Sequence, residues 1–144
     1  MFFPRYYWPV GVYDVGTDAL FMALYTRYNV TPLADKITEL YNTEADDEAV
    51  FPYGVFSLPS NVPDGGGFSE DWEDYLIQFV LHSKEPLATE VCNAFGALKA
   101  AYDKHDLAVA GYELIILMRE SAVLIRVEKV WQYAITYRLL IEKG

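Results

Sequence analysis

The amino-acid sequence predicts a single α+β domain, in which a mostly antiparallel sheet carries two main helices packed on one face. Its 144 residues suit one domain of ordinary size. Two segments have apolar residues at helical spacing, and each is followed by segments with the character of strands. We place the domain at residues 17–144, after an aromatic N-terminal arm at residues 1–16.

The first helix is expected to run to about Tyr28, because apolar residues recur at spacings of three and four before it. Either Asp14 or Thr17 is a suitable cap for its start. Thr31-Pro32 predicts a second, short helix, with Thr31 as the N-cap and Pro32 at the first helical position. Residues 37–41 either continue that helix or become extended, and the pattern leaves both open.

The middle of the chain predicts two strands separated by a glycine-rich loop. Residues 53–58 form a short β-type run between two prolines, and the loop at residues 61–67 contains three consecutive glycines. A long strand with an apolar centre is expected from Glu70 to His82.

The last third of the chain predicts one helix and an antiparallel pair of strands. Pro86 opens the helix, and its predicted apolar stripe contains Leu87, Val91, Phe95, Leu98 and Tyr102. The strands at residues 113–126 and 131–141 are expected to join through Glu128-Lys129. Residues 131–141 alternate between apolar and mostly polar, which indicates one buried face.

The distribution of charge along the sequence limits the kinds of molecule that the protein is expected to bind. The net charge is −10, and all of the excess lies in residues 1–85, which hold 14 acidic and 4 basic side chains. Such a surface repels phosphate backbones, so we expect no nucleic-acid-binding role that depends on a basic face. The N-terminus lacks a basic leader before an unbroken apolar stretch, and no apolar run approaches the ~20 residues that span a bilayer. We therefore expect a soluble protein, internal if bacterial, with no membrane partner.

No pattern of nucleophile and base is evident. His82 lies at a strand end, His105 lies in a polar loop, and Cys92 lies beside the apolar stripe of its helix. No local motif joins the cysteine to a histidine. We expect Cys92 to be a small core or boundary residue.

Neither the clustered carboxylates nor the three consecutive glycines match a motif for a catalytic or binding site. Glu70, Asp71, Glu73 and Asp74 surround Trp72, but in a strand they divide between two faces, so a solvated strand entrance is the better interpretation. The acidic run at residues 44–48 lacks the spacing of a calcium loop, and the three glycines are not followed by Lys-Ser or Lys-Thr. The sequence thus predicts no catalytic residues, no cofactor and no metal site.

The order of several motifs resembles one known family. Phe51-Pro-Tyr-Gly-Val-Phe56 follows an acidic stretch, and a glycine-rich loop leads into the strand at residues 74–83. A helix rich in Ala and Leu, a step from Leu107 to Gly111 and the tyrosine-rich segment Trp131–Ile141 come after it. Between Ala19 and Lys143 the layout is similar to the tail terminator, or tail-completion, proteins of long-tailed bacteriophages.

The resemblance implies a structural virion protein of the neck region, made in the host cytoplasm. It implies a homo-hexameric ring at the head-proximal end of the tail tube, with the major tail tube protein and the head-completion or connector proteins as partners. DNA would pass through the ring without specific binding, and the acidic residues suit such a lumen because they repel phosphate.

Candidate contact residues fall in three short segments. The candidates for the subunit or tube interface are Tyr6, Tyr7, Trp8, Asp64, Gly65, Gly66, Gly67 and Phe68. Those for an acidic lumen or rim are Glu44, Asp46, Asp47 and Glu48. Removing residues 65–67 is expected to spare folding and lower assembly.

Three other functions stay open at this point. One is a head-completion or adaptor ring protein of the same neck. Another is a small cytoplasmic binding module that dimerises through an open sheet edge. The third is a cofactor-free enzyme.

Overall fold

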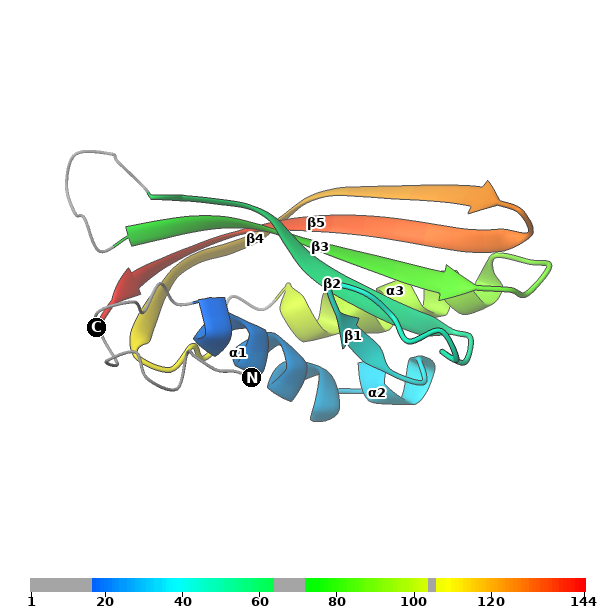
Figure 1. Cartoon of the computed structure of the whole chain (residues 1–144), viewed down its shortest axis with the longest axis horizontal. Coiled ribbons are helices and arrows are strands. Elements are labelled where there is room, and N and C mark those ends of the chain that lie inside the picture. Colours follow the sequence, from blue (N-terminus) through cyan, green and yellow to red (C-terminus); the bar gives the residue numbers. More distant parts are fainter. Residues whose placement is uncertain (1–16, 64–71, 104–105) are drawn as a thin grey trace.

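A five-stranded sheet with helices on one side dominates the computed structural model, which describes residues 17–63, 72–103 and 106–144 (Figure 1). The strands are β1 (Leu40–Asn42), β2 (Tyr53–Pro63), β3 (Trp72–Ser83), β4 (Tyr112–Val127) and β5 (Val130–Lys143). Their order across the sheet is β1-β2-β3-β5-β4. Only β1 and β2 are parallel, and the other neighbours are antiparallel. The predicted fold class is confirmed.

Three helices make the second layer: α1 (Thr17–Asn29), α2 (Leu33–Lys36) and α3 (Thr89–Tyr102). All three lie on the same side of the sheet (Figure 1). The predicted spacing of α1 is confirmed, since its buried residues are Leu20, Ala23, Leu24 and Tyr28. No helix in the described ranges is long and apolar enough to cross a bilayer.

The start of α2 differs from the prediction. Pro32 stands at the N-cap position of α2, and no side chain caps the helix. The Thr31 hydroxyl instead donates to the Tyr28 carbonyl at 3.3 Å, so it satisfies a group at the end of α1. Residues 37–41, left open between helix and strand, are not helical, because α2 ends at Lys36 and β1 begins at Leu40.

Helix α3 begins three residues later than expected from Pro86. Leu87 therefore precedes the helix, and its 73% exposure shows that its assignment to the buried stripe was wrong. The buried stripe consists of Val91, Ala94, Leu98, Ala101 and Tyr102. Two members of this stripe, Ala94 and Ala101, are small residues that the predicted stripe did not include.

Strand β2 is longer than predicted. It continues beyond Pro59 through a shift in register between Ser57 and Ser60, and residues 61–63, expected to be loop, pair with β3. The rest of the glycine-rich loop, residues 64–67, lies outside the described residues. Gly54 lies where β2 passes β1, and a Cβ there would meet side-chain carbons of Leu40 and Leu81 at 3.1 Å. This close approach favours glycine.

The core lies between the helices and one face of the sheet. Alternate residues of β3 and β5 point into it, and the register places Phe79 beside Ile135 and Ile77 beside Tyr137. The core residues of these two strands are Tyr75, Ile77, Phe79, Leu81, Ile135, Tyr137, Leu139 and Ile141, all almost completely buried. The predicted alternation along residues 131–141 is therefore confirmed, although Leu140, predicted on the opposite face, is buried as well.

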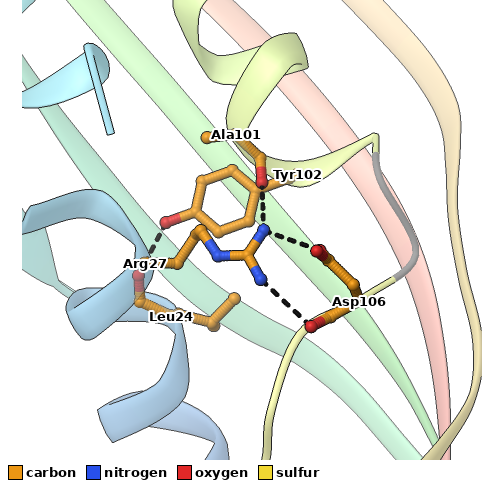
Figure 2. Close-up of polar contacts among 5 residues, drawn as sticks. All are labelled: Leu24, Arg27, Ala101, Tyr102 and Asp106. Carbon is orange, nitrogen blue, oxygen red and sulfur yellow. Dashed lines mark hydrogen bonds and ion pairs between the residues drawn. The ribbon is translucent and has the colours of Figure 1, made fainter. Parts of the chain in front are cut away.

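Polar contacts fasten α1 to the end of α3 (Figure 2). The Arg27 guanidinium donates to the Ala101 carbonyl at 2.9 Å and contacts Asp106 through both its carboxylate, at 2.8 Å, and its carbonyl, at 3.0 Å. The Tyr102 hydroxyl donates to the Leu24 carbonyl at 2.6 Å. Burial raises the pKa of Tyr102, which keeps the hydroxyl protonated for this role. A cation at the C-terminus of α3 also complements the helix dipole.

Strands β4 and β5 form a hairpin with a two-residue turn, as predicted. Val127 pairs with Val130, and the two turn residues, Glu128 and Lys129, have φ of 51° and 68°. Positive φ at both central positions is the geometry of a type I′ turn, and residues other than glycine or asparagine adopt it at a cost.

Candidate interaction surface

The face of the sheet opposite the helices carries no helix among the described residues (Figure 1). We call its central part the open face, which consists of side chains that strand alternation points away from the core. They are Tyr53, Val55, Ser57, Gln78, Val80, His82, Ser121, Val123, Ile125, Gln132, Ala134 and Thr136. On β2, β3 and β5 these side chains are half-buried by their neighbours.

The register arranges the open face in rows that cross four strands. One row is entirely apolar, because Val55 pairs with Val80, Val80 with Ala134, and Ala134 with Val123. The row on the hairpin-tip side contains Tyr53, His82, Gln132 and Ile125. The row on the other side is polar and contains Ser57, Gln78, Thr136 and Ser121. The open face is thus an apolar band bordered by groups that form hydrogen bonds.

The apolar band becomes most exposed on β4, which is an edge strand. Five of the large apolar side chains that are exposed belong to this one strand: Ile115, Met118, Val123, Ile125 and Val127. Exposed apolar side chains on a strand with a free edge indicate a contact surface.

The acidic loop borders the other end of the band. Glu44, Asp46, Asp47 and Glu48 are exposed, and none of them forms an ion pair within the described ranges. The loop and the open face together line a hollow of about 520 Å³. Residues 43–46 form one wall, and Val55, Val80 and His82 are among the side chains on the other. The loop itself is exposed, as expected of a lumen or rim, but its place in an assembly stays a prediction.

His82 does not meet a nucleophile. Its ring stacks on Tyr53 with centroids 4.6 Å apart, on the open face. Burial lowers the pKa of His82 and favours the neutral ring. Cys92 lies on α3, on the other side of the sheet, and is exposed, so its expected place in the core or at its boundary was wrong. His105 lies outside the described residues.

The described carboxylates near Trp72 form structural contacts. Asp74 accepts hydrogen bonds from Arg138 at 2.8 and 3.2 Å, in a bidentate ion pair between β3 and β5. Glu73 points to the other face and accepts a hydrogen bond from the Tyr75 hydroxyl at 3.2 Å. In the described part of the chain, no group of three or more His, Cys, Asp or Glu is arranged to hold a metal ion.

The remaining candidate residues cannot be placed on this surface. Tyr6, Tyr7 and Trp8, together with residues 64–68, lie outside the described ranges. Sequence reasoning missed the exposed apolar residues of β4, because their pattern is the same as that of a buried strand. Only the position of β4 at the edge of the sheet shows that they are exposed.

The fold and this surface define a small α+β protein built around a two-layer core, with an apolar band on the open face and an acidic loop at its border. The fold is similar to a chain in the structure of the virion of a native gene transfer agent particle, with a TM-score of 0.74 and 19% identity over 90% of this chain and 98% of that one. It is also similar to the gp17 protein of bacteriophage SPP1, with a TM-score of 0.56 and 15% identity over 92% of this chain and 95% of that one. No protein-family model and no curated protein matches the sequence.

Proposed function

We propose that this chain is a structural protein of a phage-like virion. It would cap the head-proximal end of the tail tube as a homo-hexameric ring, stop tube polymerisation and present a surface to the head-completion or connector proteins. The observation that carries this proposal is the fold, which matches a virion chain over nearly the whole length of both. The order of motifs along the sequence supports the more specific role of a tail terminator.

The described surface suits an assembly protein better than an enzyme. Its apolar band crosses four strands, and His82 and Cys92 lie on opposite sides of the sheet. Interfaces between proteins use such apolar patches with a polar border. The proposed partners are therefore proteins: other copies of the chain, the tube protein and the neck proteins.

The acidic loop supports a passage for DNA. Its four exposed carboxylates belong to no ion pair in the described ranges, so their negative charge is not cancelled locally. A lumen or rim lined in this way repels a polyanion at short range and prevents it from adhering. The residues assigned to this role are Glu44, Asp46, Asp47 and Glu48.

Deletion of the gene from the genome that encodes the particle tests the role. If the chain is the terminator, tails become abnormally long or uncapped and fail to join heads in electron micrographs. Tails of normal length beside filled heads that leak DNA would instead assign it to head completion. Normal particles in normal number would contradict both roles. Expression of the intact gene in trans is the control.

A further inference from the structure

A groove of about 570 Å³ runs along α1, in the helix layer of the molecule. Helix α1 and the turn after it form one wall, and the segment that leads into β4 forms the other. Its apolar lining includes Ala19, Met22, Ala23, Val30, Leu107 and Ala108. Met22 and Val30 are 69% and 74% exposed, so within the described residues the groove presents large apolar side chains to water. Such exposure costs free energy, which a segment that covers the groove recovers.

The charged side chains that line the groove have roles in the fold. Arg27 donates hydrogen bonds to the Ala101 carbonyl and to Asp106, and these contacts occupy its guanidinium (Figure 2). Asp18 lies at one end of the groove, in the first turn of α1, where a carboxylate complements the helix dipole. The surface between these two residues is mainly apolar, so the groove fits an apolar segment of chain rather than an ion.

The sequence that precedes α1 has a matching apolar character. Residues 1–16 contain six aromatic residues, three valines and only two charged residues, one of each sign. The even positions from 6 to 12 are occupied by Tyr6, Trp8, Val10 and Val12. In an extended segment, alternation places these four side chains on one side. Pro9 and Gly11 stand between them and disfavour a helix there.

The arm is long enough and close enough to fill the groove. It joins α1 at Thr17, beside the end of the groove that Asp18 lines. From there to Val30 the helix rises about 18 Å, which about six extended residues cover at about 3.3 Å each. With residues 14–16 as a reversing turn, this register brings Val10 beside Met22. A segment tethered so close to its site binds at an effective concentration in the millimolar range.

We propose that residues 6–13 of the N-terminal arm pack as an extended segment into the groove along α1 of the same chain, with Trp8, Val10 and Val12 toward the helix. The arm then completes the helix layer, and the open face stays the surface for other proteins. Tyr7 lies on the opposite side of the extended arm, where it is available for the subunit contact expected from the sequence. The inference concerns one chain by itself and does not rest on the proposed function.

Cross-linking tests whether the arm reaches the groove of its own chain. In a Cys92→Ser background, Val10→Cys combined with Met22→Cys is treated with a short bismaleimide at low protein concentration. We expect an internal cross-link, identified by mass spectrometry of the digested monomer, to form about tenfold faster than in the control or faster still. The matched control is Val10→Cys combined with Val127→Cys, because Val127 is also exposed but lies beside the turn between β4 and β5.

Substitution of Met22 tests whether this side chain is covered. Glutamine has a similar length and helix propensity, so on a bare surface Met22→Gln changes stability little. Under the arm it places an amide against apolar side chains, and we expect the melting temperature of the full chain, followed by circular dichroism, to fall by about 3 °C or more. Leu87→Gln is the matched control, because Leu87 is 73% exposed and does not line the groove. In a Trp8→Ala background, where the arm is held less tightly, Met22→Gln should lower the melting temperature by less than about 1 °C.

Three results would overturn the inference. Equal cross-linking rates for the two cysteine pairs, or equal changes in melting temperature for Met22→Gln and Leu87→Gln, would show that the arm does not fill the groove. A covalent dimer formed through Val10→Cys and Met22→Cys would show that the arm enters the groove of another copy instead. None of these results bears on the gene-deletion phenotype, which tests the proposed function separately.

Discussion

The two faces of the sheet differ in how far their side chains are buried, because the helices cover only one of them. On β3, Phe79 is 1% exposed and packs against Tyr102 and Tyr137, whereas its neighbour Val80 lies on the open face and is only half-buried. The helix-covered face therefore provides stability within the chain. The open face carries an apolar band between polar rows and has no described helix over it, and we propose that another protein covers this band.

The largest predicted effect on stability comes from shortening one of two adjacent side chains of β3 that lie on opposite faces of the sheet. Phe79→Ala should lower the free energy of unfolding by about 3–5 kcal/mol, because it removes a large buried ring and leaves a cavity. Val80→Ala, one residue away on the open face, should cost about 1 kcal/mol or less. Urea denaturation monitored by circular dichroism measures both. Equal losses would show that the open face is also covered within the single chain.

Loss of the hydrogen bonds that join α1 to the end of α3 should have the next largest effect on stability. Arg27→Met keeps the length of the side chain but removes the donors to Ala101 and Asp106. We expect the free energy of unfolding to fall by about 2 kcal/mol, because methionine cannot form the hydrogen bonds that the charged guanidinium donates. The same denaturation assay measures it, with Arg138→Met as a comparison on the other side of the sheet. A loss below about 0.5 kcal/mol would mean that water replaces these contacts.

Substitutions in the turn between β4 and β5 should raise the free energy of unfolding, whereas the preceding substitutions lower it. Glu128→Asn combined with Lys129→Gly places residues suited to positive φ at both turn positions. We expect the monomer to gain about 1 kcal/mol in the free energy of unfolding. A weaker self-association of the same variant would indicate that the natural residues at this tip are retained for contact. No gain in stability would contradict the backbone conformation of the turn.

The smallest effect concerns His82 and pH. Because its pKa is lowered in the folded chain, the unfolded chain binds the proton more readily. The stability contributed by the neutral ring is complete above the unfolded pKa of about 6.5 and is lost as the pH falls toward the folded pKa. His82→Gln should therefore lose less stability than the natural chain as the pH falls through about 6.5. Parallel pH curves would contradict the burial of this ring.

Local sequence patterns predicted most of the helices and strands. They failed where the burial of a residue depends on how the elements pack together. Helical spacing before Tyr28 and alternation after Trp131 were sufficient for α1 and β5, because each has a single apolar face. They failed at Leu87, which only precedes a helix, and at Cys92, whose exposure depends on the rotation of α3. The prediction of Thr31 as the N-cap of α2 was wrong because its hydroxyl binds the end of the preceding helix instead.

The contact surface was harder to predict than the fold. The apolar residues of β4 look like core until the strand is known to be an edge, and this depends on pairing between segments far apart in the sequence. The predicted acidic residues are indeed exposed, but their role depends on other copies of the chain. The aromatic arm and the glycine-rich loop stay predictions, because they lie outside the described residues.

A reconstruction by electron microscopy of particles from the strain that carries this gene tests the central claim most directly. The account predicts a ring of six copies at the head-proximal end of the tail tube, with the open face of each copy in contact with another protein. Particles that lack the chain, or that hold it elsewhere with the open face in contact with solvent, would contradict it.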